Sequence, residues 1–173
     1  IGGIEDVFMA QSFNTNMTRY LQMCELKTAA LIATSAECGA LLAGLDSQKY
    51  RAYGNNLGIA FQIIDDVLDI TQDSEVLGKP AMSDFSEGKI TLPYIYLYER
   101  ANEAQRQELL ALFCTPLSQD SIAWLREHLY MYDCIQDSIT KAREYAFCAL
   151  DSIQGENNAH LQEVVNNMIE REF

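Results

Sequence analysis

The sequence predicts an all-α domain. Apolar residues recur with helical periodicity along most of the chain, whereas the strict alternation that marks half-buried strands is scarce. The 173 residues suit one globular domain, and an apolar content of 49% allows a sizeable core. No low-complexity tract or obvious internal repeat divides the chain. We therefore expect residues 1–173 to form a single domain of packed helices.

The predicted helices are separated by the residues that usually interrupt helices. Gly44, Pro116 and Gly155 stand between neighbouring helical patterns, whereas Pro93 fits the first turn of a helix. The expected helices cover residues 17–44, 47–71, 90–112, 119–131, 134–154 and 159–171.

The first predicted helix is dense in small residues, which let neighbouring backbones approach closely. Residues 28–45 also have about the minimum length of a membrane span, but they include Glu37 and several weakly polar residues. We expect a close-packed core helix here and no transmembrane segment.

The second predicted helix contains the stretch "FQIIDDVLDI", which places three aspartates in an otherwise apolar run. At roughly 100° per residue, Gln62, Asp65 and Asp69 fall within about 60° of one another, and Asp66 lies at the margin of that stripe. A helix that is apolar on both flanks is buried. Its polar stripe is therefore expected to face an internal cavity or cleft.

Three carboxylates on one buried stripe need a compensating partner. Like charges about 4 Å apart cost ~4 kcal/mol at an effective dielectric of about 20. With only carboxylate oxygens nearby, a hard cation such as Mg²⁺ is one solution, its shell completed by water and phosphate. The alternative is that these acids pair with Lys or Arg from neighbouring helices, or that the helix is less buried than its pattern indicates.

Lysines on both sides of the acidic helix favour a phosphate ligand. The irregular segment 72–88 follows directly after that helix, and Lys79 and Lys89 lie in or beside it. Upstream, Lys27 and Thr28 interrupt a helix of apolar and small residues. Lysines near a carboxylate-bound Mg²⁺ would complete a site for a highly charged phosphate group. Ordinary solvated loop charge and a snorkelling Lys27 are the alternatives.

Charge and cysteine content exclude several other functions. Twenty-five acidic against twelve basic residues give a net charge of −13, which argues against nucleic-acid partners. The five cysteines are widely spaced, and they form neither a C-x-x-C pair nor a cluster with histidine. A zinc site or disulfide framework is therefore not expected, and we predict reduced thiols in a cytoplasmic protein.

Four blocks of the sequence together resemble one known family. They are "KTAALI", "GIAFQIIDDVLDI", "LGKPAMSDFSEGKITLP" and the closing "IEREF". Their order and spacing resemble the trans-prenyl diphosphate synthases of the polyprenyl synthetase family. The pattern "EGKITLP" is more similar to the medium- and long-chain, octaprenyl-like members than to the short farnesyl type.

The resemblance implies a fold, a reaction and partners. The fold is an isoprenoid-synthase-type bundle of long helices around a central cavity. The reaction is the head-to-tail (1′-4) condensation of isopentenyl diphosphate with an allylic diphosphate to a polyprenyl diphosphate. The cofactor is Mg²⁺, and the expected assembly is a homodimer.

The resemblance also implies a role for each residue that matches a family motif. The implied metal ligands are Asp65, Asp66 and Asp69. The implied substrate-binding residues are Lys27, Phe61, Gln62, Lys79 and Lys89. The implied catalytic residues are Lys27, Thr28, Gln62 and Asp65, with Thr28 and Gln62 stabilising the developing cation.

Some family features do not match this sequence. The first aspartate-rich motif and the Gly-Gly-Lys segment that binds isopentenyl diphosphate are missing. We therefore expect the chain to correspond to the C-terminal half of a synthase and to be inactive alone. The alternative is a non-catalytic helical subunit of a two-polypeptide synthase, whereas a terpene cyclase fits the motifs poorly. Met82 stands where the family usually has glycine.

Overall fold

The computed structural model describes residues 12–72, 81–155 and 159–169, and within them the chain is helical with no strand. The predicted all-α class is therefore confirmed. In chain order the helices are α2 (Met17–Cys24), the π-helical turn η1 (Glu25–Ala29), α3 (Ala30–Ala43), α4 (Ser47–Thr71), α6 (Ser83–Ser86), α7 (Leu92–Arg100), α8 (Glu103–Leu112), α9 (Gln119–Met131), α10 (Cys134–Ser152) and α11 (Ala159–Ile169).

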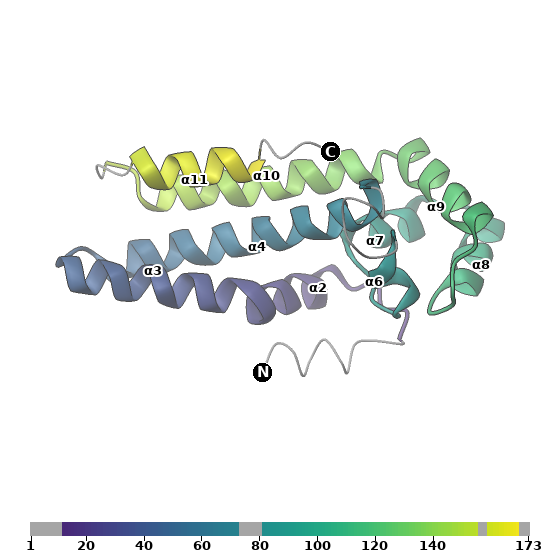
Figure 1. The fold of residues 1–173 in the computed structure, drawn as a ribbon, viewed down its shortest axis with the longest axis horizontal. Coiled ribbons are helices and arrows are strands. Elements are labelled where there is room, and N and C mark those ends of the chain that lie inside the picture. The colour runs from purple at the N-terminus through teal and green to yellow at the C-terminus, as the bar shows by residue number, and fades with distance from the viewer. Residues whose placement is uncertain (1–11, 73–80, 156–158, 170–173) are drawn as a thin grey trace.

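Helix α4 lies at the centre of the molecule. Figure 1 shows it between one layer formed by α2 and α3 and another formed by α10 and α11, with α7, α8 and α9 gathered beyond its C-terminal end. More than half of its residues are buried, including Ile63, Ile64 and Val67. The expected burial of this helix is therefore confirmed.

Short polar signals fix where α4 begins. The Asp46 side chain accepts a hydrogen bond from the Gln48 backbone N–H at 3.1 Å, which satisfies one of the free donors of the first turn. Just before it, Gly44 ends α3 in the left-handed conformation (φ 70°). The observed bounds of α4 agree with the helix predicted over 47–71.

Two glycines let α4 approach the first helical rod very closely. A Cβ atom added at Gly58 would lie 2.4 Å from the Ala29 Cα, and one added at Gly54 would lie 2.7 Å from the Ala33 Cα. Both distances are far too short for real side-chain contacts. The small residues predicted to allow close packing therefore do so, on the face that meets α4.

The other face of α3 differs from the expectation of a core helix. Leu31, Leu41 and Leu42 are exposed there, with Leu42 at 91%. By length and composition alone, Met17–Ala43 could cross a membrane, although core helices of soluble proteins and signal sequences pass the same test. Only 17% of the most apolar window of this stretch is buried.

The helix predicted over 90–112 is two helices. Ala101 has an extended backbone (ψ 148°), and α8 starts immediately after Asn102. The Asn102 side chain accepts from the Gln105 N–H at 3.0 Å, while the Gln105 side chain accepts from the Asn102 N–H at 2.9 Å. This reciprocal capping box starts a new helix and explains why the single-helix prediction is wrong.

The segment after α4 returns to pack against it. Residues 73–80 lie outside the described residues, and the single-turn helix α6 follows. Met82 has a left-handed backbone (φ 57°), the conformation that glycine adopts without strain, and its side chain is fully buried. Its N–H donates to the Asp69 carbonyl at 2.8 Å. At Met82, burial of the apolar side chain beside α4 therefore offsets the strain of the left-handed backbone.

Candidate functional site

The predicted pair Lys27 and Thr28 lies in the π-helical turn η1. Such wide turns occur mostly as single insertions in α-helices and often at functional sites. This one lies where Gly58 of α4 approaches Ala29. The Thr28 hydroxyl donates to Gln62 Oε1 at 2.6 Å, so the turn directs Thr28 toward the polar part of α4.

Asp66 is the most deeply engaged of the three predicted aspartates. It is 2% exposed, and its two oxygens accept hydrogen bonds from the Tyr20 hydroxyl at 2.7 Å and from Gln62 Nε2 at 2.9 Å. Burial raises the pKa of Asp66 to about 7, although the hydrogen bonds from Tyr20 and Gln62 oppose this shift. This carboxylate is costly to keep charged, and polar neighbours hold it on both sides.

These contacts join two helical rods through one continuous polar chain, defined here as Tyr20, Asp66, Gln62 and Thr28. It starts on α2, crosses to α4 and returns to η1. Burial, followed by the nearby charge of Asp66, raises the pKa of Tyr20 well above its ordinary value. The tyrosine therefore stays protonated and donates to Asp66.

Asp69 has a different set of partners. It is buried, and it accepts from the Ser83 hydroxyl at 2.9 Å and from the Asp84 N–H at 3.2 Å. Both donors belong to the segment that returns after α4. Asp69 thus fixes the position of α6, which contains Asp84, and of the segment that continues to Lys89.

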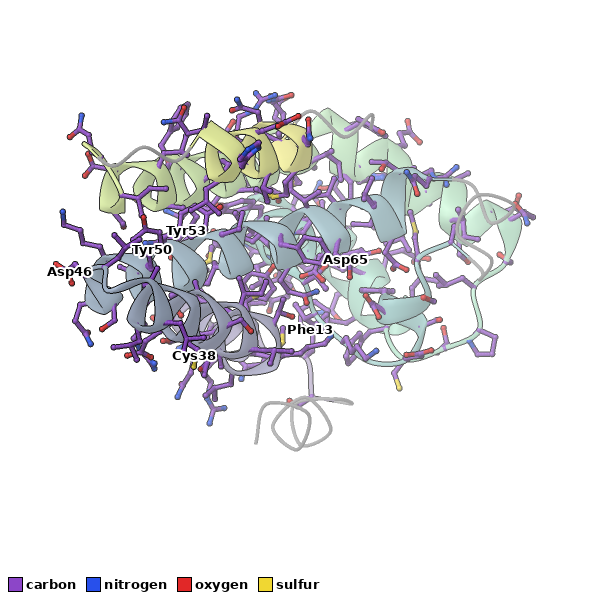
Figure 2. The ribbon with its side chains drawn as sticks, turned by 60° about the vertical axis from the view of Figure 1, so that its left-hand side comes forward. Phe13, Cys38, Asp46, Tyr50, Tyr53 and Asp65 are labelled. Carbon is purple, nitrogen blue, oxygen red and sulfur yellow. The ribbon has the colours of Figure 1, made fainter. Side chains whose placement is uncertain are left out.

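Asp65 is the exposed member of the three. Its polar contact is with Gln62 Nε2 at 3.5 Å, at the limit of a hydrogen bond. Figure 2 shows Asp65 on the C-terminal half of α4, well away from Tyr53 near the other end of the helix. An exposed carboxylate with weakly engaged oxygens is available to a ligand.

The three predicted aspartates have different contacts within the described residues. Asp66 faces α2, Asp69 faces the returning loop, and Asp65 faces outward. In the parts of the chain that the structure describes, no group of three or more His, Cys, Asp or Glu side chains could hold a metal ion. Their surroundings separate because the residues of neighbouring elements, rather than helical angle alone, decide which way each side chain turns.

A small polar cavity lies beside this chain of contacts. Its volume is about 30 Å³, which is room for about two water molecules. Thr91 borders it with a buried hydroxyl that has no hydrogen-bond partner among the described residues. The cavity is lined by Ser12, Asn14, Tyr20, Met23, Lys27, Asp66, Asp84, Lys89, Ile90 and Thr91.

Both described lysines of the predicted site reach this cavity, and Lys79 lies outside the described residues. Lys89 Nζ lies 3.0 Å from Asp84 Oδ1 and 2.9 Å from Glu87 Oε2. Desolvation lowers the pKa of Lys89, but its hydrogen bonds to Glu87 and Asp84 outweigh that effect and raise it. Lys89 is therefore a permanent cation at the cavity wall.

Phe61 lies away from the polar cavity. It borders a groove of about 430 Å³ between α3, α4 and α11. The other residues of that groove are Ile32, Leu57, Val164, Asn167 and Met168. The structure thus brings together Lys27, Thr28, Gln62, Asp66 and Lys89, and it sets Phe61 apart.

A comparison with protein-family models matches residues 1–129 to the polyprenyl synthetase family. The chain belongs to the polyprenyl synthetase family. The family resemblance that the sequence motifs indicated is therefore confirmed.

Curated relatives of this family member have different product names. It is 31% identical to heptaprenyl diphosphate synthase component 2 of Bacillus subtilis over 100% of this chain and 51% of the relative. It is 38% identical to a geranylgeranyl diphosphate synthase of Sulfolobus acidocaldarius over 78% of this chain and 42% of the relative. The chain therefore spans at most about half the length of these relatives.

Solved structures share the fold. Octaprenyl pyrophosphate synthase from Helicobacter pylori matches with a TM-score of 0.91 and 43% identity, over 98% of this chain and 55% of that one. A polyprenyl synthase from Caulobacter crescentus CB15, complexed with calcium and isoprenyl diphosphate, matches with a TM-score of 0.90 and 29% identity, over 99% and 55%. The predicted isoprenoid-synthase-type fold is thus confirmed.

The carboxylate oxygens of the three aspartates and Asp84 are the type of donor that a hard divalent cation prefers. Mg²⁺ usually takes one or two carboxylates and keeps water and phosphate in its remaining positions. Asp65 is exposed, and Asp84 borders the cavity. An ionised carboxylate has about four lone-pair sites, so Asp66 also keeps acceptor capacity beyond its two hydrogen bonds. By donor chemistry these carboxylates suit Mg²⁺, although among the described residues no three of them are grouped as a metal site.

Sequence reasoning missed two residues of the site, Tyr20 and Asp84. Tyr20 precedes Lys27 by seven residues, which places both on nearly the same helix face. That spacing was a usable signal, but a tyrosine in an apolar pattern looks like an ordinary core residue. Asp84 stands five residues before Lys89 in the loop, where an acid in a polar stretch has no distinguishing pattern.

Proposed function

We propose that this polyprenyl synthetase family member supplies the diphosphate-binding part of a trans-prenyltransferase. The enzyme would condense isopentenyl diphosphate with an allylic diphosphate in a head-to-tail (1′-4) reaction and release a longer polyprenyl diphosphate. The observation that supports the proposal is the polar chain: its Asp66 lines a cavity that Lys27 and Lys89 also line, and hydrogen bonds join Asp66 to Gln62 and Gln62 to Thr28.

The residues of the site can act at two stages of such a reaction. Lys27 and Lys89, with Lys79 as the third predicted lysine, would bind the allylic diphosphate and stabilise the negative charge that develops as it leaves. Thr28 and Gln62 would place oxygen atoms near the allylic carbon as positive charge develops there. Phe61 would contact hydrocarbon in the apolar groove.

The aspartates would hold the cofactor. Mg²⁺, when bound, would neutralise charge on the diphosphate. Asp65 is the most accessible ligand, and Asp66 and Asp69 complete the proposed metal-ligand set. Asp69 would act partly through the loop, because its hydrogen bonds to Ser83 and Asp84 hold that loop against α4.

The first test uses the protein expressed from its complete gene. It is incubated with labelled isopentenyl diphosphate, an allylic primer and Mg²⁺, and the products are sized. The wild type is expected to form polyprenyl diphosphate. Asp65→Ala is expected to lose at least about 100-fold in kcat/KM, since it removes charge stabilisation at the reacting group.

Asp151→Ala is the matched control for this assay. Asp151 is an exposed acid near the end of α10, far from the cavity-lining residues in sequence. Its loss is expected to leave product formation unchanged. A well-folded wild type that forms no product would contradict the proposed reaction.

The assembly of the active protein is a second part of the proposal. We infer a homodimer, with association with a second polypeptide as the alternative. The relative from Bacillus subtilis is named component 2 of its synthase, and this name is the reason for testing association with a second polypeptide. Light scattering of the purified protein, with and without co-purified polypeptides, separates a dimer of identical chains from a two-component complex.

We also propose that the protein acts in the cytoplasm. All five cysteines are free, and Cys24 and Cys134 are buried, as expected for a protein kept in a reducing compartment. Cell fractionation with an antibody against the protein tests this location.

A further inference from the structure

We propose that Tyr20 is a positioning residue for the proposed prenyltransferase reaction, acting on Thr28 through Asp66 and Gln62. This inference rests on the proposed function. Tyr20 is 3% exposed, and its hydroxyl donates to Asp66 Oδ2 at 2.7 Å. Three hydrogen bonds, through Asp66 and Gln62, connect Tyr20 to Thr28 at the other end of the polar chain.

The direction of each hydrogen bond in the polar chain follows from the atoms that meet. The Tyr20 hydroxyl donates to Asp66 Oδ2, and the Gln62 amide nitrogen, which can only donate, faces Asp66 Oδ1. Gln62 therefore turns its amide nitrogen toward Asp66 and also toward Asp65, at 2.9 and 3.5 Å. Two carboxylates on that side fix the amide orientation more firmly than either would alone.

The orientation of Gln62 then determines what Thr28 can do. With its nitrogen directed at the carboxylates, Gln62 presents Oε1 to Thr28, which donates its single hydroxyl proton at 2.6 Å. The Thr28 oxygen keeps its lone pairs for other partners. A hydroxyl fixed in this way presents negative partial charge, which suits a neighbouring carbocation and not an anion.

The Tyr20 hydroxyl restrains Asp66, the next residue in this chain of contacts. Without its hydroxyl, Asp66 Oδ2 would lose its donor and the carboxylate would be free to turn. Gln62 would then lose part of the restraint on its amide, and Thr28 could reverse its hydrogen bond. Tyr20 therefore preorganises the Thr28 oxygen, three hydrogen bonds away through Asp66 and Gln62, without itself touching the reacting atoms.

Tyr53 provides a matched control, because it is equally buried. It is also 3% exposed, but its hydroxyl donates at 3.1 Å to the backbone carbonyl of Leu161 on α11. Removing either hydroxyl takes one buried hydrogen bond from the fold. Only Tyr20 connects to the proposed catalytic residues.

The test compares Tyr20→Phe with Tyr53→Phe in the protein from the complete gene. Loss of a hydrogen bond to a charged group predicts that Tyr20→Phe lowers kcat by about 10- to 100-fold. The KM for the allylic primer should change less than about 2-fold, because the affected charge appears only in the transition state. Tyr53→Phe should change kcat less than about 2-fold.

A double-mutant cycle distinguishes positioning from a general loss of stability. If Tyr20 acts through Thr28, the double variant Tyr20→Phe/Thr28→Val should lose no more kcat than the worse single variant. Independent structural damage would instead multiply the two losses. Multiplicative losses would overturn the inference.

A second readout needs no turnover. The side-chain amide signal of Gln62, observed by ¹⁵N NMR and identified by its loss in Gln62→Glu, should move in Tyr20→Phe and stay in Tyr53→Phe. If Tyr20→Phe does not fold, 3-fluorotyrosine at position 20 keeps the ring and hydroxyl and should still move this signal. An unmoved signal would overturn the inference.

The outcomes separate the two proposals. A wild type that makes no prenyl product overturns the proposed function and the role of Tyr20 with it. An active wild type in which Tyr20→Phe behaves like Tyr53→Phe overturns the role of Tyr20 alone.

Discussion

The two halves of α4 meet the first helical rod in opposite ways. In the N-terminal half, Gly54 and Gly58 omit side chains, and the backbones of α3 and η1 come as close as geometry allows. In the C-terminal half, Gln62 and Asp66 fill the space with polar side chains that reach across to η1 and α2. The same pair of rods is therefore joined by close packing at one end and by hydrogen bonds at the other.

This difference shows how a closely packed interface can hold two helical rods in place while the neighbouring part of the same interface remains polar and chemically active. Close packing positions η1 rigidly, and the polar half then needs only a few directed bonds to place Thr28 and Asp66. The polar half also keeps acceptor capacity and two nearby lysines, which an apolar interface would not offer. The following predictions test this division, from the largest expected effect on stability to the smallest.

Gly58→Val should be the most damaging change. A Cβ at this position would lie 2.4 Å from the Ala29 Cα, so the backbone of η1 must move. We expect a loss of about 3 kcal/mol in the free energy of unfolding, measured by urea denaturation. Gly39→Ala is the control, because a Cβ there meets nothing within 4 Å, and it should be neutral or slightly stabilising. Equal stability of the two variants would disprove close packing here.

Met82→Gly tests the anchor of the returning loop. Glycine removes the strain of the left-handed backbone, worth about 1–2 kcal/mol. It also removes a fully buried side chain, which costs about 2–5 kcal/mol. The net result should be a destabilisation of about 1–3 kcal/mol. A more stable variant would show that strain outweighs burial at this position.

The buried Asp66 predicts a pH dependence of stability. Its pKa is raised from 3.8 to about 7, so the folded protein binds more protons than the unfolded chain between these values. The contribution of Asp66 to the free energy of unfolding is therefore fully present below pH 3.8 and is lost as pH rises through about 7. The free energy of unfolding would fall by at most about 1.4 kcal/mol for each pH unit in this range.

The measurement compares the wild type with Asp66→Asn in chelator-containing buffer. Other acids affect both proteins alike, so the difference between their unfolding free energies isolates Asp66. The wild type should lose stability relative to the variant as pH increases from about 4 to about 7. A parallel pH dependence in both proteins would show that Asp66 is not buried as the structure places it.

Lys89→Met should have the smallest effect on stability and a large one on binding. Lys89 is paired with Asp84 and Glu87, but the side chain is 27% exposed, and such pairs contribute about 0–1 kcal/mol. Lys141→Met is the control, since Lys141 is 34% exposed and pairs with Glu144 at 2.8 Å. Only the change at Lys89 should weaken pyrophosphate binding, which calorimetry measures.

The sequence predicted the helices best where one signal dominated. The strong apolar period and the interruption at Gly44 located α4, and Pro93 correctly indicated a first helical turn. The break at Ala101 was missed, although "NEAQ" contains the residues of a capping box. A continuous apolar pattern masked this local start signal.

The structure brings several of the predicted site residues together, in an arrangement that helical angle alone does not give. The motifs located Lys27, Thr28, Gln62 and the three aspartates, and the structure joins several of them through hydrogen bonds. The separate surroundings of the aspartates could not be predicted, because Tyr20 and Ser83 come from other elements. Helical angle describes one helix, whereas burial depends on every element packed against it.

The most direct test of the central claim is calorimetric titration of pyrophosphate, with and without Mg²⁺, into the protein from the complete gene and its Asp65→Asn variant. If the C-terminal half of α4 is the diphosphate site, the wild type will bind pyrophosphate in a Mg²⁺-dependent manner. Asp65→Asn, which keeps the size of the side chain but removes its charge, will bind at least about 10-fold more weakly. Equal, Mg²⁺-independent binding by both proteins would contradict the claim.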